Sequence, residues 1–148
     1  MYVYLAAPML GDRSALNFVR LLAKTLEEKG YHVITPHVIE EVLDVERGLT
    51  PREIFERDVK LMEEADVLVA EVSYPSLGVG FEIAYCLMLG KPVIALCSRE
   101  RLEKTSALIR GISLPNFRLI AYIDPVDGIE SLLEELKSIK VKAHGRSE

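Results

Sequence analysis

The sequence of 148 residues has no tryptophan, only two cysteines and only three histidines. Cys86 and Cys97 are too few for a disulfide framework and match no metal motif, so we expect both to be buried as small apolar side chains. The histidines His32, His37 and His144 form no HExxH-like cluster. We therefore expect no zinc site and no other metal centre.

Long apolar runs and an excess of positive charge are also absent. No run reaches the roughly 18 apolar residues of a membrane span, and no basic stretch precedes the apolar residues at the start of the chain. The 18 basic and 23 acidic residues give a net charge of −5, whereas a nucleic-acid-binding surface needs clustered positive charge. We expect a cytoplasmic protein that binds neither a membrane nor a nucleic-acid polymer. A small anionic ligand is compatible with this charge, because a pocket needs only a few local donors.

Apolar residues make up 49% of the chain, which is enough for a sizeable core, and the length fits one domain. We expect a single domain over residues 1–139, followed by a polar C-terminal tail at 140–148. Short β-branched runs alternate with segments of helical period. Strands are predicted at 2–7, 31–35, 66–72, 92–97 and 117–122, and helices at 16–29, 51–65, 78–89, 100–111 and 126–139. Residues 38–49 are predicted to be a loop with some helix.

This alternation predicts an α/β fold, with a five-stranded parallel sheet and helices on both of its faces. The strand order of such a three-layer sandwich is flavodoxin-like or Rossmann-like. Residues 67–70 form an unbroken apolar run, which favours a central strand buried on both faces. Ligands of these folds bind beyond the carboxyl ends of the strands. The loops at 7–14, 36–50, 73–80 and 97–106 are therefore the candidates for a site.

The ends of two helices carry clear signals. Thr50 is a cap residue, Pro51 suits the first turn and Glu53 completes a capping box, which together predict a helix start. Gly30 is predicted to end the first helix, because glycine readily adopts the left-handed conformation found there.

The segment 73–80 (SYPSLGVG) carries the strongest functional signal. Gly78 and Gly80 let backbone approach a ligand closely, and the helix that follows presents free N–H groups. Ser76 adds a hydroxyl that can face an anion. The dinucleotide fingerprint GxGxxG is absent from the chain, so we expect no cofactor.

Three further polar residues each have a structural and a functional explanation. Glu82 is expected in the first turn of the helix at 78–89, where a carboxylate complements the helix dipole or faces a ligand. Asp58 lies inside the helix at 51–65, although aspartate is a poorer helix former than glutamate. Tyr4 stands in the first strand, where its phenol needs a hydrogen-bond partner.

Several motifs together resemble one known family. Residues 3–8 (VYLAAP) resemble the opening strand of the nucleoside 2-deoxyribosyltransferase superfamily. Residues 65–72 (ADVLVAEV), 75–82 (PSLGVGFE) and 106–111 (SALIRG) resemble one branch of it, the 2′-deoxynucleoside 5′-phosphate N-hydrolases. The likeness runs in order from residue 2 to about residue 122, and PSLGVG-x-E is its most specific part.

The resemblance implies a role for each matching position. Glu82 corresponds to the family's nucleophilic glutamate and Asp58 to its catalytic-site aspartate. Tyr4 corresponds to a tyrosine that orients the glutamate and crowds the 2′ position of the sugar. Ser76 matches a phosphate-binding serine. Ser106 matches a second serine, which reaches the phosphate from the partner subunit of a homodimer with shared active sites.

Other matching positions concern substrate contacts. His37 aligns with a histidine beside the substrate, and Arg13 is the arginine of the first loop that is available to a phosphate. Leu108, which the resemblance also assigns to the partner subunit, stands where many relatives have methionine, and Phe81 stands where they have tyrosine. These departures affect the expected substrate preference more than the reaction type.

The activity that the resemblance implies is hydrolysis of the N-glycosidic bond of a 2′-deoxynucleoside 5′-monophosphate. The products are a free base and 2-deoxyribose 5-phosphate, and the intermediate is a glycosyl ester of Glu82. A carboxylate suits this chemistry because it stabilises an oxocarbenium-like transition state, while Asp58 can protonate the departing base. Two alternatives stay open. One is transfer of the deoxyribosyl group to another base, and the other is a non-catalytic nucleotide-binding module in which Glu82 only caps a helix.

Overall fold

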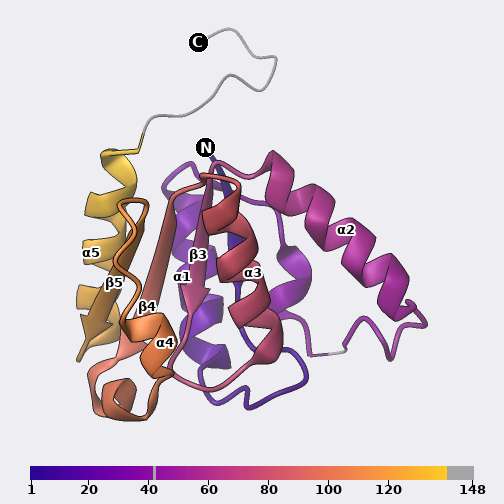
Figure 1. Cartoon of the computed structure of the whole chain (residues 1–148), viewed down its shortest axis with the longest axis horizontal. Helices are drawn as coiled ribbons and strands as arrows, with labels where there is room; N and C mark the ends of the chain where they lie inside the picture. Colours follow the sequence, from indigo (N-terminus) through magenta and orange to yellow (C-terminus); the bar gives the residue numbers. More distant parts are fainter. Residues whose placement is uncertain (42, 140–148) are drawn as a thin grey trace, which may run out of the picture.

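The computed structural model describes residues 1–41 and 43–139, and the predicted tail at 140–148 lies outside them. Its centre is one sheet of five parallel strands in the order β2-β1-β3-β4-β5 (Figure 1). The strands are β1 (Tyr2–Ala6), β2 (His32–Val33), β3 (Val67–Glu71), β4 (Val93–Ser98) and β5 (Phe117–Tyr122). This order is the flavodoxin-like one, so the predicted parallel α/β sheet is confirmed and the Rossmann order does not apply.

Helices cover both faces of the sheet and divide the core in two. On one face, α1 (Leu16–Glu28) and α5 (Pro125–Lys137) bury Leu22 and Leu132 against the strands. On the other face, α2 (Pro51–Glu64) and α3 (Leu77–Met88) pack over Tyr4 and Leu68 (Figure 1). All five residues of β3 are buried, as its apolar run predicts. No helix in the described ranges is long and apolar enough to cross a membrane.

The two predicted helix ends are confirmed. The Thr50 hydroxyl accepts a hydrogen bond from the Glu53 N–H at 3.1 Å, and the Glu53 carboxylate accepts one from the Thr50 N–H at 2.9 Å. This capping box fixes the start of α2 and therefore the direction in which its later residues point. Gly30 follows α1 with a φ of 89°, a conformation that favours glycine.

The second strand is shorter than the predicted 31–35 and ends at Val33. The Thr35 side chain replaces the backbone ladder there, because its hydroxyl accepts from the Leu5 N–H at 2.9 Å and donates to the Leu5 carbonyl at 2.8 Å. The chain then turns into a short 3₁₀ helix, η1 (Pro36–Ile39), which carries His37.

The predicted helix at 100–111 is also divided. A 3₁₀ helix, η2 (Arg99–Lys104), is followed by α4 (Ala107–Arg110). Thr105 interrupts them because its side chain is buried and its hydroxyl bonds to the Arg101 carbonyl at 3.1 Å. The interruption makes Ser106 the N-cap of α4.

Candidate active site

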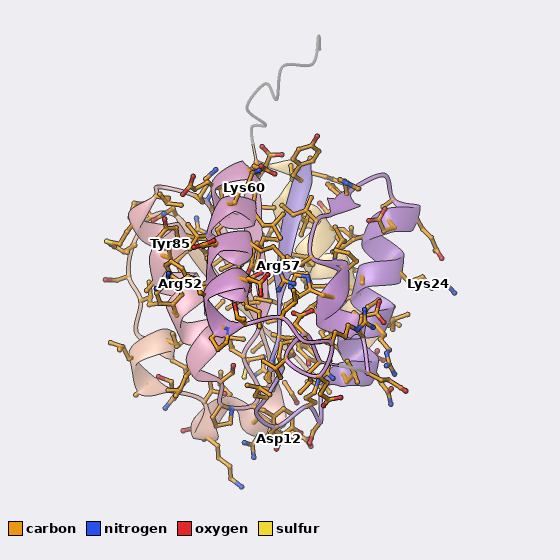
Figure 2. The ribbon with its side chains drawn as sticks, turned by 90° about the vertical axis from the view of Figure 1, so that its right-hand side faces the viewer. Asp12, Lys24, Arg52, Arg57, Lys60 and Tyr85 are labelled. Atoms are coloured by element: carbon orange, nitrogen blue, oxygen red, sulfur yellow. The ribbon has the colours of Figure 1, made fainter. Side chains whose placement is uncertain are left out.

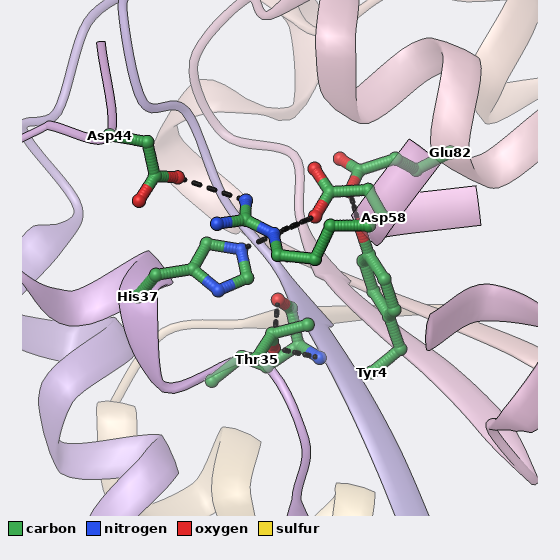
Figure 3. Close-up of polar contacts among 8 residues, drawn as sticks. Tyr4, Thr35, His37, Asp44, Asp58 and Glu82 are labelled. Atoms are coloured by element: carbon green, nitrogen blue, oxygen red, sulfur yellow. Dashed lines mark hydrogen bonds and ion pairs between the residues drawn. The ribbon is translucent and has the colours of Figure 1, made fainter. Parts of the chain in front are cut away.

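The candidate site lies where the strand order reverses, between β1 and β3. A ligand crevice forms at such a switch point because the helices that follow neighbouring strands leave on opposite faces of the sheet. Tyr4 points from the middle of β1 toward α2 and α3, where Asp58 and Glu82 lie (Figure 3). The structure thus brings together the three residues that the sequence marks as catalytic candidates.

Tyr4 and Glu82 form the centre of the site. The Tyr4 phenol is 1% exposed and donates a hydrogen bond to the Glu82 Oε2 atom. Burial raises the pKa of Tyr4 well above its usual range, and the charge of Glu82 raises it further, so the phenol keeps its proton. Within the described residues no donor bonds to the Glu82 Oε1 atom. One carboxylate oxygen is therefore held and the other is free to react.

The pKa of Glu82 is raised to about 7, and burial is the main cause. The hydrogen bond from Tyr4 opposes this rise in pKa, whereas the nearby negative charge of Asp58 adds to it. At neutral pH a large fraction of Glu82 is ionised. Because few groups stabilise this carboxylate, it is more reactive than one that is fully hydrogen-bonded.

The position of Glu82 in its helix differs from the predicted one. The helix α3 begins at Leu77, and the Ser76 hydroxyl caps it by accepting from the Val79 N–H at 3.3 Å. Glu82 therefore lies in the second turn, and the first turn holds no acidic residue. Since the helix dipole acts mainly on the first turn, it does not explain this glutamate.

Asp58 belongs to a second polar group, which joins α2 to the segment after β2 (Figure 3). The Arg57 Nε donates to the Asp58 Oδ1 at 2.9 Å, and the Arg57 Nη2 donates to the Asp44 Oδ2 at 2.9 Å. The His37 Nε2 lies 3.6 Å from the same Asp58 Oδ1. Burial lowers the pKa of His37 and the positive charge of Arg57 lowers it further, which favours the neutral imidazole.

The glycine-rich start of α3 leaves open space around two of its residues. A Cβ atom built on Gly80 would meet nothing within 4 Å, and one on Gly78 would meet only the Ser76 Oγ at 3.9 Å. The Gly80 N–H already donates to the Ser76 carbonyl, whereas the Gly78 N–H donates to no described group. Ser76 keeps its hydroxyl proton for another acceptor, since its oxygen acts only as an acceptor in the cap. Gly78 and Ser76 are thus the available donors, and Gly80 supplies space only.

The remaining predicted site residues lie outside this hydrogen-bonded group. Arg13 donates through Nη2 to the Val38 carbonyl at 3.0 Å, and its buried Nε has no partner among the described residues. The Ser106 hydroxyl accepts from the Ile109 N–H at 3.4 Å, and Leu108 is 82% exposed. No hydrogen bond or ion pair of the described chain joins Ser106 to the group shown in Figure 3.

Two residues of the site were not predicted from the sequence. Arg57 stands beside the predicted Asp58, and Asp44 lies in a segment of mixed charges that was predicted to be a loop. No spacing rule pairs the two residues, because only the folded segment between β2 and α2 brings them together. The described residues include no cluster of three or more His, Cys, Asp or Glu side chains suited to a metal ion.

A parallel α/β sheet that places two carboxylates, a buried phenol and a helix N-terminus at its switch point is the arrangement of an enzyme-like site. The family model of nucleoside 2-deoxyribosyltransferase matches residues 3–123. The chain belongs to this family.

Individual relatives agree with this assignment. A protein of Thermofilum pendens, provisionally named 2′-deoxynucleoside 5′-phosphate N-hydrolase 1, is 70% identical over 89% of this chain and 92% of its own. The 5-hydroxymethyl-dUMP N-hydrolase of Danio rerio is 33% identical over 91% of this chain and 94% of its own. Among solved structures, the CMP N-glycosidase of Clostridium botulinum superposes with a TM-score of 0.66 at 25% identity, over 89% of this chain and 98% of that one.

Proposed function

We propose that this protein is a hydrolase that cleaves the N-glycosidic bond of 2′-deoxynucleoside 5′-monophosphates. The observation that carries this proposal is the state of Glu82, whose Oε2 accepts from Tyr4 while its Oε1 has no described donor. The names of relatives in the family, which are N-hydrolases of deoxynucleotides, support the same substrate class. The products are the free base and 2-deoxyribose 5-phosphate.

The reaction has two steps at the anomeric carbon C1′. In the first step the bond from C1′ to the base nitrogen breaks, its electron pair leaves with the base, and Glu82 Oε1 bonds to C1′. The departing base takes up a proton with the help of Asp58, directly or through a water molecule. In the second step water attacks C1′ and gives up a proton to Asp58, which restores the proton used in the first step, and the ester bond breaks so that Glu82 leaves as a carboxylate. The sugar keeps its original configuration.

The deoxyribose preference follows from the position of Tyr4. Its phenol donates a hydrogen bond to the nucleophile Glu82. A 2′-hydroxyl on the sugar would therefore lie against Tyr4 and Glu82. A 2-deoxy sugar also lacks an electron-withdrawing hydroxyl, which makes its oxocarbenium-like state easier to reach. We therefore expect ribonucleotides to be poor substrates.

The 5′-phosphate is bound at the start of α3. The free hydroxyl proton of Ser76 and the uncommitted N–H of Gly78 are its donors, and the space beside Gly80 accommodates the group. Arg13 donates to the Val38 carbonyl of η1, its buried Nε has no partner among the described residues, and it is the positive charge available to the phosphate. Each hydrogen bond to a charged phosphate contributes about 1.5–3 kcal/mol.

The site is completed in a homodimer in which Ser106 and Leu108 come from the partner subunit. An exposed apolar stripe on α3 supports this arrangement: Leu77 is 98% exposed, Met88 is 76% exposed and Phe81 is about half exposed. These three residues lie on one face of α3, by the helical repeat. Such a stripe beside the catalytic residues is typical of a protein–protein contact.

The dimer is tested by mixing two inactive variants. A heterodimer of a Glu82→Gln subunit and a Ser106→Ala subunit contains one site in which both residues are intact. We expect this heterodimer to recover part of the wild-type rate, whereas each homodimeric variant stays impaired. No recovery in verified heterodimers contradicts shared sites.

The function is tested by measuring base release from dGMP, deoxyguanosine and GMP. We expect dGMP to be cleaved at least about 100-fold more efficiently than deoxyguanosine, because several charged hydrogen bonds are lost with the phosphate. Equal rates with deoxyguanosine contradict the phosphate site. Transfer of the sugar to an added free base indicates a transferase, and no release from any deoxynucleotide indicates a binding module.

A further inference from the structure

Arg57 links two parts of the site that are separate in the sequence. It lies on the flank of α2 that faces η1, whereas Arg52 lies on the opposite flank (Figure 2). Its guanidinium bonds to Asp58 on α2 and to Asp44, each at 2.9 Å. Asp44 is only 13% exposed, so this contact is not a loose ion pair at the surface.

The bond between Arg57 and Asp58 joins two adjacent residues of one helix. Neighbouring residues in a helix point to different sides, so Arg57 and Asp58 do not face each other by helix geometry alone. The arginine has to fold back along α2 to bond to Asp58, and the second bond to Asp44 holds it there. A guanidinium can make both contacts at once because its donors lie in a rigid plane.

We propose that Arg57 is a positioning residue that fixes Asp58 toward the leaving base by tying it to Asp44. The proposal rests on the proposed function, since Asp58 is the group that assists the departing base. Arg57 occupies the Oδ1 atom of Asp58, where His37 also lies at 3.6 Å. The Oδ2 atom has no described hydrogen-bond partner and is left for the base or for a water molecule.

Arg57 also balances the charges of the site. Glu82 is faced by Tyr4 from β1, by Asp58 and Arg57 from α2, and by Cys86 from its own helix. The positive charge of Arg57 lowers the pKa of Glu82, although burial and Asp58 raise it overall. Arg57 is therefore the cation that opposes the rise in the pKa of Glu82.

The test measures base release from dGMP by Arg57→Gln, Asp58→Asn and the double variant. We expect Arg57→Gln to lower kcat by about 10- to 100-fold with little change in KM, because a misplaced Asp58 affects bond breaking rather than phosphate binding. When kcat is compared at a pH above the acidic limb, where the effect of Arg57 on the pKa of Glu82 no longer matters, the same substitution in the Asp58→Asn background lowers kcat by no more than about twofold, since the residue it positions is already lost. If the losses in kcat of the two single variants multiply in the double variant, the positioning role is overturned.

The pH profile separates positioning from charge. Arg57→Gln moves the acidic limb of kcat/KM to higher pH, because the pKa of Glu82 rises without the cation. Arg57→Lys keeps the charge but cannot bridge two carboxylates, so it restores the acidic limb and not kcat. A full recovery of kcat by Arg57→Lys overturns the bridging role.

Two further variants complete the test. Asp44→Asn weakens the anchor and leaves Asp58 unchanged, so it lowers kcat in the same direction even if Arg57→Gln does not fold. Arg52→Gln, an exposed position on the other flank of α2, is the matched control and keeps the wild-type kcat. A wild-type kcat in Asp44→Asn overturns the proposal. No base release by the wild-type protein overturns the proposed function as well, which distinguishes the two failures.

Discussion

Within residues 1–41 and 43–139, two pairs join a tyrosine hydroxyl to a glutamate that is buried or half-buried. In one pair Tyr4 donates to Glu82, and in the other Tyr122 donates to Glu71 at 2.6 Å. Glu71 is 1% exposed, and its second oxygen accepts from the Ser73 N–H. Glu82 has no described second donor, and the negative charge of Asp58 lies nearby.

Under the proposed function, the Tyr122–Glu71 pair serves structure and the Tyr4–Glu82 pair serves chemistry. Both oxygens of Glu71 are occupied, so its carboxylate fixes the turn that leads from β3 to Ser76. The Ser73 hydroxyl extends this support by accepting from the Ser98 N–H at 2.8 Å. The Glu82 carboxylate keeps one oxygen free, which a nucleophile needs. The number of donors, rather than the residue types, separates the two roles.

The largest expected effect comes from changing each glutamate to glutamine. Glu82→Gln should lower kcat for dGMP by about 10³-fold or more, because the amide keeps the shape but cannot attack C1′. Glu71→Gln should keep kcat within about threefold. It should lower the free energy of unfolding by about 1–3 kcal/mol, because the amide NH₂ group would face one of the two donors, the Ser73 N–H and the Tyr122 hydroxyl, and could not accept from it. Base release and thermal unfolding of both variants measure this. Near-normal turnover by folded Glu82→Gln contradicts the mechanism.

Sequence reasoning predicted the sheet, the helix pattern and the residues at the centre of the site. The unbroken apolar run of β3 and the capping box of α2 depend on neighbouring residues only, so one sequence reveals them. The short β2 depends on the Thr35 side chain reaching across to Leu5, and the break at Thr105 depends on a buried hydroxyl. Long-range polar contacts of this kind have no periodicity in the sequence.

The same distinction between local sequence signals and long-range contacts applies to the residues of the candidate site. Glu82 and Asp58 were found because whole motifs around them resemble a family. Arg57 and Asp44 were missed because their contact depends on the path of the segment between β2 and α2. Glu82 lies in the second turn of α3 because Ser76 caps this helix and Leu77 begins it. The predicted start was instead at residue 78, the first of the two glycines.

The second effect concerns stability and its dependence on pH. The pKa of Glu82 is raised to about 7 in the folded state from an ordinary value of 4.5. Its contribution to stability is therefore present below pH 4.5 and is lost as the pH rises through 7. Relative to wild type, Glu82→Gln should gain up to about 3 kcal/mol of unfolding free energy between pH 4 and pH 8. Urea unfolding at both pH values measures the gain, and parallel stability curves contradict it.

A smaller effect is expected at Ser76, beyond the turn that Glu71 holds. Ser76→Ala should lower kcat/KM for dGMP by about 10- to 30-fold, through the loss of one hydrogen bond to a charged group. The same substitution should leave the slow cleavage of deoxyguanosine unchanged. Steady-state kinetics with both substrates measure the difference. An equal loss with both substrates indicates damage to α3 and contradicts a phosphate contact.

The smallest effect separates the two tyrosines. Tyr4→Phe removes a hydrogen bond that lowers the pKa of Glu82, so the acidic limb of kcat/KM should move to higher pH. Tyr122→Phe removes the equivalent bond at Glu71 and should leave that limb in place. The pH profiles of the two variants, measured side by side, provide the comparison. A shift in Tyr122→Phe, or none in Tyr4→Phe, contradicts the assignment.

The hydrogen bond between Tyr4 and Glu82 also has a consequence for folding, because it joins residues 78 positions apart in the chain. The strand β1 lies between β2 and β3. Tyr4 can therefore bond to Glu82 only after β3 and α3 have packed against β1. Contacts of such separation form late, since the entropy of closing a long loop opposes them. During synthesis the Tyr4–Glu82 pair cannot assemble until Glu82 has left the ribosome. Recovery of base release during refolding should therefore report the pairing of the central strands.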